Sequence, residues 1–279
     1  SNEWTLTSIP DAPFKLEFHQ ESLEETPVRV TRALIRSLVG QRVRHEQLVA
    51  VVEGGQQITI GFSQPLKAIQ IETRLNGNIV ATSRGRSGLR IDVPTTSSLG
   101  TSQPSDTESP TRFLLDIRLW TETDSSPWWT SIEPLMRLPV GSAQIDWQLS
   151  VPTDSHLFWA SSSCGRLMRW EREQLRLSRQ PMADDAELLE WVTFPFQENA
   201  TLLGSLNEST TNSAFTVPSN QYLFYSSDPY SFSALTVSRT MMWLAVGSLS
   251  LLLAASTQLF PRSRHPFAIV LLAVVLAGV

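Results

Sequence analysis

The feature that most constrains this chain lies near its C-terminus, where Met241–Phe260 includes no charged side chain. A helix of about 20 residues rises about 30 Å, which is the thickness of one bilayer core. A polar turn at Pro261–Pro266 follows, and Phe267–Val279 is again wholly apolar but too short to span a bilayer. The sequence therefore predicts a transmembrane segment at 239–279, a helical hairpin with helix 241–260, turn 261–266 and a truncated second helix at 267–279.

Basic residues near the apolar run predict its orientation. The turn carries Arg262 and Arg264, whereas Arg239 is the only basic residue in the twenty positions before the helix. Because cytoplasmic loops are enriched in Lys and Arg, we expect the turn in the cytoplasm and the bulk of the chain in a periplasmic or extracellular compartment. Trp243 is expected at the membrane interface, so Trp243, Arg262 and Arg264 are the predicted anchor residues. A buried hairpin of a soluble protein and a cytoplasmic N-terminal region are the alternatives.

Composition narrows the remaining classes of protein. The net charge of −5 and the lack of a basic stripe in the sequence argue against a nucleic-acid partner. The single cysteine, Cys164, precludes an intramolecular disulfide and a thiolate metal cluster, which favours a bacterial envelope protein over a eukaryotic ectodomain. Because the sequence begins at Ser1 and its second apolar helix is cut short, we expect a fragment that is open at both ends.

The pattern of residues 1–94 predicts an antiparallel β-sandwich domain. Apolar and polar residues alternate at Ile58–Phe62, and Asn76-Gly77 separates two apolar runs, as two-residue hairpin turns prefer. Val28–Leu38 fits either a helix face or a strand, and its β-branched start favours a strand. Short strands separated by turns about ten residues apart are typical of sandwiches.

The composition of the sequence changes at 95–110, and this stretch determines how the chain could be divided into domains. This Ser/Thr/Pro-rich stretch is either a linker that precedes a second β-rich domain at 111–238 or a loop inserted in one sheet. Alternation predicts strands at Arg112–Trp120 and Gln144–Val151, and a short helix is expected near 183–192. The predicted fold is mainly β, with one or two antiparallel sandwiches followed by the helical hairpin.

No motif in the sequence identifies a catalytic centre. Cys164 and His156, with Asp154 to orient the histidine, have the residue types of a thiol nucleophile, but no family signature surrounds them. The serines at 161–163 lack the flanking glycines of a nucleophile elbow. The sequence therefore predicts no catalytic residue, and it leans against an enzyme without deciding the question.

Metal-ligating residue types occur without the spacing of a metal site. The histidines form no HExxH motif or short-spaced cluster, which argues against zinc; they are His19, His45, His156 and His265. Asp184, Asp185 and Glu187 suit the first turn of a helix, so the helix dipole explains them without a metal. We expect neither a metal nor another cofactor.

Two further patterns have ordinary explanations. Glu171 with Glu173, or Asp146 across a sheet, could form a glycosidase pair, but the sequence does not fix their separation, and solvated carboxylates are the default interpretation. Asn199 and Asn207 begin N-glycosylation tripeptides, which matter only in a eukaryotic protein.

The nine tryptophans are unusually many for this length. Trp147, Trp159 and Trp170 lie on apolar-patterned strands and are expected in the core. Trp128 and Trp129 lie in a polar loop, where they could stack on a sugar, enter a lipid headgroup layer or cap the core, and capping is the favoured reading. These two are the residues predicted to bind a ligand.

The sequence thus predicts a membrane-anchored protein of the cell envelope. Its extracytoplasmic β-sandwich region is expected to bind a protein or glycan partner or to act as a structural spacer, with the lipid bilayer as a further partner and no nucleic acid. The alternative is an accessory or sensory ectodomain of a larger membrane enzyme, transporter or receptor whose active part lies outside this sequence. A sandwich architecture by itself predicts no activity.

Overall fold

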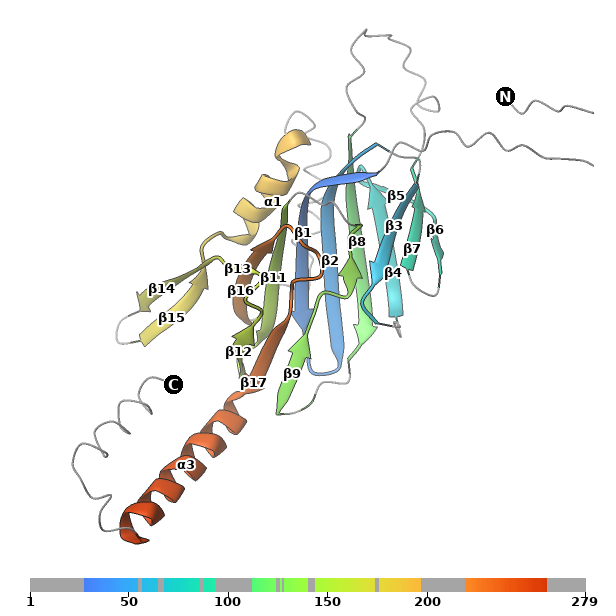
Figure 1. The fold of residues 1–279 in the computed structure, drawn as a ribbon. Helices are drawn as coiled ribbons and strands as arrows, with labels where there is room; N and C mark the ends of the chain where they lie inside the picture. The colour runs from blue at the N-terminus through green and yellow to red at the C-terminus, as the bar shows by residue number, and fades with distance from the viewer. Residues whose placement is uncertain are drawn as a thin grey trace, which may run out of the picture.

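The computed structural model describes residues 28–54, 57–64, 68–85, 88–93, 112–123, 126, 128–139, 144–173, 176–196 and 219–259. Most of these residues form strands (Figure 1). The largest sheet has the strand order β13 (Gly165–Arg166), β16 (Ser219–Ser226), β11 (Gln144–Pro152), β1 (Arg29–Val39), β2 (Val43–Glu53), β8 (Arg112–Glu122), β4 (Ala68–Leu75) and β5 (Asn78–Ile79).

Three smaller sheets complete the β structure of the described residues. One has the order β10 (Met136–Arg137), β3 (Gln57–Phe62), β7 (Gly88–Asp92) and β6 (Thr82–Arg84). A second has the order β12 (Ser155–Ala160), β17 (Ala234–Ser238) and β9 (Trp129–Ile132), and β14 (Met168–Glu173) pairs with β15 (Arg176–Pro181). The helical elements in the described ranges are α1 (Asp185–Thr193), the 3₁₀ turn η2 (Phe194–Phe196) and α3 (Arg239–Leu259).

The large sheet is buried on both faces. On its inner face, Ile35 and Trp147 belong to the main core, together with residues of two of the smaller sheets, such as Ile60 and Ile132. Its outer face packs against α1 through a second apolar cluster, whose members include Leu34, Val49, Leu188, Leu189 and Val192. Burial on both faces explains why residues 48–52 (LVAVV) are continuously apolar, since the usual alternation marks a strand with one wet face.

The strand pairing confirms a mainly β fold but differs from the prediction of an antiparallel sandwich in one place. β1 runs parallel to β11, with Ile35 opposite Trp147, whereas every other pair that the structure describes is antiparallel. β8 pairs with both β2 and β4, so strands from either side of the 95–110 stretch share one sheet. The stretch itself lies outside the described residues, and the predicted domain boundaries stay predictions.

Two local predictions are confirmed. Asn76 and Gly77 both have positive φ values, 50° and 79°, as a type I′ turn requires, and they join β4 to β5. Helix α1 begins beside Asp184, whose side chain accepts a hydrogen bond from the Glu187 backbone N–H at 2.8 Å. The Glu187 carboxylate accepts in return from the Asp184 backbone N–H at 3.0 Å, which completes a capping box.

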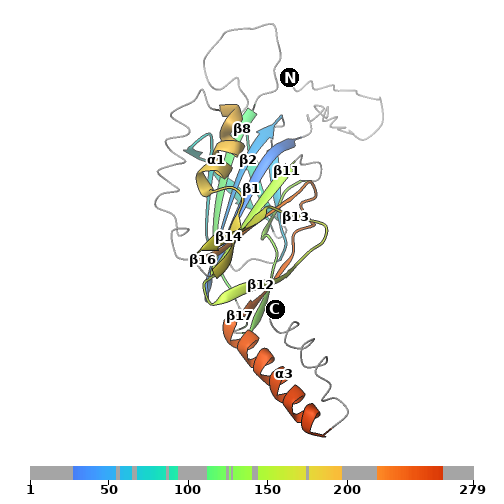
Figure 2. The same ribbon diagram turned by 90° about the vertical axis from the view of Figure 1, so that its left-hand side faces the viewer.

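The predicted transmembrane hairpin is contradicted. Helix α3 forms over Arg239–Leu259 and leaves the sheets directly from the end of β17 (Figures 1 and 2). None of the helices in the described part of the chain has both the length and the sustained apolarity needed to cross a membrane. Gly247, Ser248 and Ser250 interrupt the run of large apolar residues in the middle of α3. The turn at 261–266 and the second helix at 267–279 lie outside the described residues.

Candidate aromatic binding surface

Of the two predicted binding residues, Trp129 lies in a small sheet whose outer face carries large aromatic side chains, and Trp128 directly precedes it. Partners directly opposite each other in antiparallel strands point to the same face. Val237 of β17 lies opposite Trp129 of β9, and Leu235 lies opposite Trp159 of β12. These four side chains therefore share one face, and we call them, together with the neighbouring Trp128 and Phe158, the aromatic surface.

The aromatic rings of this surface are exposed to solvent. Trp129 is 55% exposed and Trp159 is 51% exposed, and Trp128 and Phe158 are exposed as well. The favoured reading of Trp128 and Trp129 as a cap on the core is therefore wrong. Exposed apolar patches of this kind mark binding surfaces more often than isolated apolar residues do.

The prediction that Trp159 belongs to the core is also wrong, because the register of β12 turns it outward. The pairing with β17 shifts between Leu157 and Trp159, so Phe158 is an extra residue at a bulge. Leu157 on one side of the bulge packs against the core, whereas Trp159 faces outward beside the buried Ala160. Trp147, by contrast, is fully buried as predicted, and the side chain of Trp170 lies outside the described residues.

The sheet that carries the aromatic surface is fixed to the body of the protein. Its inner face contributes Ile132 and Ala234 to the main core. The Tyr222 hydroxyl accepts a hydrogen bond from the Leu157 backbone N–H at 3.1 Å, and the Asn220 side-chain amide donates to the Ser155 carbonyl at 2.7 Å. The rings therefore project from a platform held by the large sheet, which lowers the ordering cost of binding.

The geometry spaces the two central rings widely. Trp129 and Trp159 lie on strands that flank β17, and their partners on β17 are two residues apart. With strands about 4.8 Å apart and about 3.4 Å per residue, their Cα atoms are separated by on the order of 12 Å. Ser131 and His156 lie on the same face, opposite Leu235 and Val237, and add hydrogen-bonding groups beside the rings.

The residues considered as a thiol nucleophile and its helpers, Cys164, His156 and Asp154, form no hydrogen bonds with one another and have other partners. The Cys164 thiol is buried and donates to the Ser161 carbonyl at 3.1 Å, and burial raises the pKa of Cys164, which disfavours the thiolate. The His156 ring lies 3.5 Å from the Asn220 amide instead. The backbone carbonyl oxygen of Asp154 accepts a hydrogen bond from the backbone N–H of Arg239.

The acidic residues considered as metal ligands, Asp184, Asp185 and Glu187, have other partners, and so has Asp146, which was considered for a glycosidase pair. Asp184 and Glu187 form the capping box, and Asp185 accepts hydrogen bonds from Arg36 and Gln148 at 2.5 Å each. Burial raises the pKa of Asp146, whose carboxylate accepts from Gln144. Within the ranges that the structure describes, no three His, Cys, Asp or Glu residues lie close enough to hold a metal ion.

Several predicted residues fall where the structure gives no side-chain information. The residues outside the described ranges are His19, Asn199, Asn207, Arg262, Arg264 and His265, and the side chains of Glu171 and Glu173 are likewise not described. Trp243 is 66% exposed on α3, one turn after the end of β17. Its role as an anchor residue stays a prediction.

A buried histidine on the outer face of the large sheet gives the fold a pH dependence. His45 stacks on Trp120 with 4.6 Å between ring centroids, and burial, with the charges of Arg118 and Arg36, lowers the pKa of His45 to about 4. Because the unfolded chain binds a proton near pH 6.5 and the native state does not, stability is lost as pH falls from about 6.5 toward 4, by at most about 3 kcal/mol.

Urea unfolding at pH 7 and pH 5 of the natural chain and of His45→Phe tests this. The substitution keeps a ring on Trp120 and removes the titration, so the stability loss between the two pH values should shrink. Equal losses in the two proteins would show that His45 titrates normally in the native state.

Comparison with known proteins gives no functional assignment. No family model matches the sequence, and no curated protein matches it. The structure is similar to M1 zinc metallopeptidase from Deinococcus radiodurans, with 10% identity and a TM-score of 0.37 over 76% of this chain and 43% of that one. It is also similar to Legionella pneumophila aminopeptidase A, with 5% identity and a TM-score of 0.38 over 75% of this chain and 21% of the other. The chain thus spans less than half the length of these proteins, and likeness at this level carries no functional argument.

Proposed function

We propose that this protein is a non-catalytic binding protein that holds an extended glycan on its aromatic surface. The observation that supports this is that Trp129 and Trp159, each more than half exposed, project from one face of a small sheet. The C–H face of a pyranose ring is apolar and packs on the flat face of an indole. With Cα atoms on the order of 12 Å apart, the two rings suit two sugar residues of one chain rather than a single sugar.

Polar groups beside the rings support a glycan as the ligand. Sugar hydroxyls lose hydrogen bonds to water when they bind, and unpaired polar groups weaken affinity. The Ser131 hydroxyl and the His156 imidazole lie on the same face as the rings and offer replacement partners. Bridging water molecules would extend the same contacts.

A protein partner is the second candidate, and one observation favours it. Leu235 and Val237 lie between the two tryptophans and are partly exposed, so the centre of the surface is an apolar strip. Apolar centres with aromatic anchors are typical of protein interfaces. The variant Leu235→Ser distinguishes the two kinds of ligand. It should weaken binding of a protein, because it removes the apolar centre of the surface, and leave binding of a glycan unchanged, because both stacking rings remain.

Affinity electrophoresis of the full chain tests the proposal. The gels contain a soluble β-glucan, a xylan or a galactomannan, and we expect at least one of them to retard the natural chain. The double variant Trp129→Ala/Trp159→Ala should migrate as in a gel without polysaccharide, while Phe194→Ala, an exposed ring next to α1, should be retarded normally. Retardation by none of the polysaccharides, or equal retardation of the double variant, would contradict a glycan ligand at this surface.

Other aspects of the predicted function are not tested by the fold. The extracytoplasmic location, the lipid bilayer as a partner and the role of a spacer stay predictions. The same holds for the alternative of an accessory or sensory ectodomain of a larger protein.

A further inference from the structure

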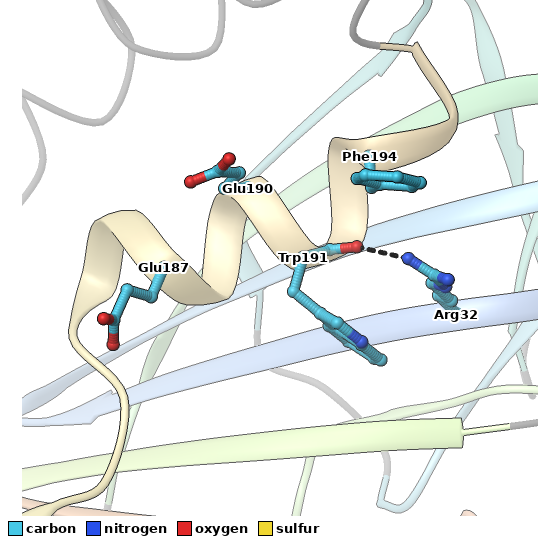
Figure 3. A pocket seen from close by; sticks show the side chains of 5 residues that line it. All are labelled: Arg32, Glu187, Glu190, Trp191 and Phe194. Atoms are coloured by element: carbon cyan, nitrogen blue, oxygen red, sulfur yellow. Dashed lines mark hydrogen bonds between the residues drawn. The ribbon is translucent and has the colours of Figure 1, made fainter.

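We propose that a second site, independent of the aromatic surface, binds a monocarboxylate with an apolar body, such as the C-terminus of a peptide. The site is a shallow pocket of about 380 Å³ beside α1, lined by Arg32, Glu187, Glu190, Trp191 and Phe194 (Figure 3). This volume lies in the usual range for small-molecule sites.

The guanidinium of Arg32 is held in place by its neighbours. Arg32 lies on β1, and its Nη1 donates to the backbone carbonyl oxygen of Trp191 at 2.8 Å. The guanidinium carbon lies 5.6 Å from the centre of the Trp191 ring and 5.8 Å from that of Phe194. Figure 3 shows Arg32 between these two rings, at the C-terminal end of the helix. Cation–π contacts and the carbonyl end of the helix both favour the charge at this position.

Most hydrogen-bonding capacity of Arg32 is unused in the part of the chain that the structure describes. A guanidinium carries five N–H groups, and with the described residues Arg32 forms a single hydrogen bond, to Trp191. The remaining N–H donors of the planar guanidinium have the spacing to donate to both oxygens of one carboxylate. Because the group is already oriented, little side-chain freedom is lost when a ligand binds.

The rest of the pocket defines the ligand. Trp191 and Phe194 offer apolar ring surface next to the charge, and Phe194 is exposed. Glu187 and Glu190 lie on the turns of α1 farther from Arg32, and the Glu187 carboxylate is held by the Asp184 backbone N–H (Figure 3). The two carboxylates repel any anion, and they repel a dianion more strongly than a monoanion, so they discriminate against phosphate. The pocket therefore suits a single carboxylate attached to an apolar group better than it suits phosphate.

Nuclear magnetic resonance titration of the full chain tests this site. The probes are 3-phenylpropionate, its neutral amide 3-phenylpropanamide, and inorganic phosphate, and the signals followed are the Arg32 Nε–H and the Trp191 indole N–H. We expect saturable shifts with the acid at a Kd on the order of 1 mM, and binding of the amide and of phosphate at least about tenfold weaker. Equal binding of acid and amide, tighter binding of phosphate, or no saturable shift with the acid would overturn the proposal.

Variants separate ligand binding from a purely structural role of Arg32. Arg32→Lys keeps the charge but removes the fork and should weaken the acid about tenfold. Phe194→Ala removes one of the two rings beside Arg32 but keeps its hydrogen bond to Trp191, and it should weaken the acid while sparing the fold, since the ring is exposed. Amide signals of Leu188 and Val192 report whether α1 stays in place in each variant. Unchanged affinity in Phe194→Ala, with α1 in place, would contradict binding in this pocket.

Discussion

Replacing Glu46 by alanine is expected to lower the free energy of unfolding by about 3–5 kcal/mol, because it leaves a buried positive charge without its partner. Glu46 is fully buried between the sheets. Its carboxylate accepts hydrogen bonds from Arg44 Nη2 at 2.7 Å, from the Ser37 hydroxyl at 2.8 Å and from the Met136 backbone N–H at 2.7 Å. These contacts join β1 and β2 to β10 of the neighbouring sheet.

Chemical denaturation of Glu46→Ala beside Glu53→Ala measures this effect. Glu53 pairs with Arg112 at 2.7 Å, but half of the Arg112 side chain is exposed. Exposed pairs contribute about 0–1 kcal/mol, so the Glu53 variant should stay close to the natural chain. If both variants lost the same free energy of unfolding, the burial of Glu46 would not make its ion pair more important than an exposed one.

Replacing Trp147 by alanine is expected to cost about 3–5 kcal/mol through the cavity it leaves. The ring is completely buried, with centroid distances of 5.2 Å to Phe224 and 5.5 Å to Phe232. Its indole N–H donates to the Ser37 hydroxyl at 3.0 Å, which links the ring to the Glu46 network. The substitution therefore removes both packing and a buried hydrogen bond.

Thermal unfolding of Trp147→Ala, with Trp243→Ala as the matched control, checks this expectation. Trp243 is 66% exposed, so its removal should hardly change the Tm. Trp147→Phe should fall between the two, because it restores part of the volume without the N–H donor. A Tm of Trp147→Ala equal to that of the control would contradict a central packing role for this ring.

Local pattern predicted individual strands well, because apolar and polar residues alternate along them even where both faces of the sheet are buried. The strand expected at Arg112–Trp120 is observed as Arg112–Glu122, and the one expected at Gln144–Val151 is observed as Gln144–Pro152. The ambiguous stretch at Val28–Leu38 is a strand, Arg29–Val39, as its β-branched start indicated. Turn chemistry at Asn76-Gly77 was equally informative.

Features that depend on distant contacts were not predictable in this way. The parallel pairing of β1 with β11 joins segments more than a hundred residues apart, and no local pattern encodes it. The bulge that turns Trp159 outward depends on the register with β17. Glu46 and Arg44 look like ordinary solvated charges in the sequence, and their burial follows from a second sheet above them. The charge-free run at Met241–Phe260 correctly predicted a helix, observed as Arg239–Leu259. The prediction that this helix spans a membrane is contradicted, because no helix in the described part of the chain is long and apolar enough.

The candidate site was only partly visible in the sequence. Trp128 and Trp129 were singled out because two large rings in a polar loop are costly to expose. The exposure of Trp159 and Phe158 on the same surface was not predicted. When the register of a strand is unknown, its apolar residues are expected to be buried. The Arg32 pocket had no sequence signal at all, since Trp191 and Phe194 meet Arg32 only across the fold.

Calorimetric titration of the natural chain and of Trp159→Ala with an oligosaccharide from the retarding polysaccharide tests the central claim most directly. If Trp159 stacks on a sugar ring, its loss should raise the Kd about 5- to 150-fold, which corresponds to about 1–3 kcal/mol for one aromatic stack. The Tm should stay unchanged, because the ring is half exposed. An unchanged Kd in Trp159→Ala would show that the glycan binds elsewhere and that the aromatic surface is not its site.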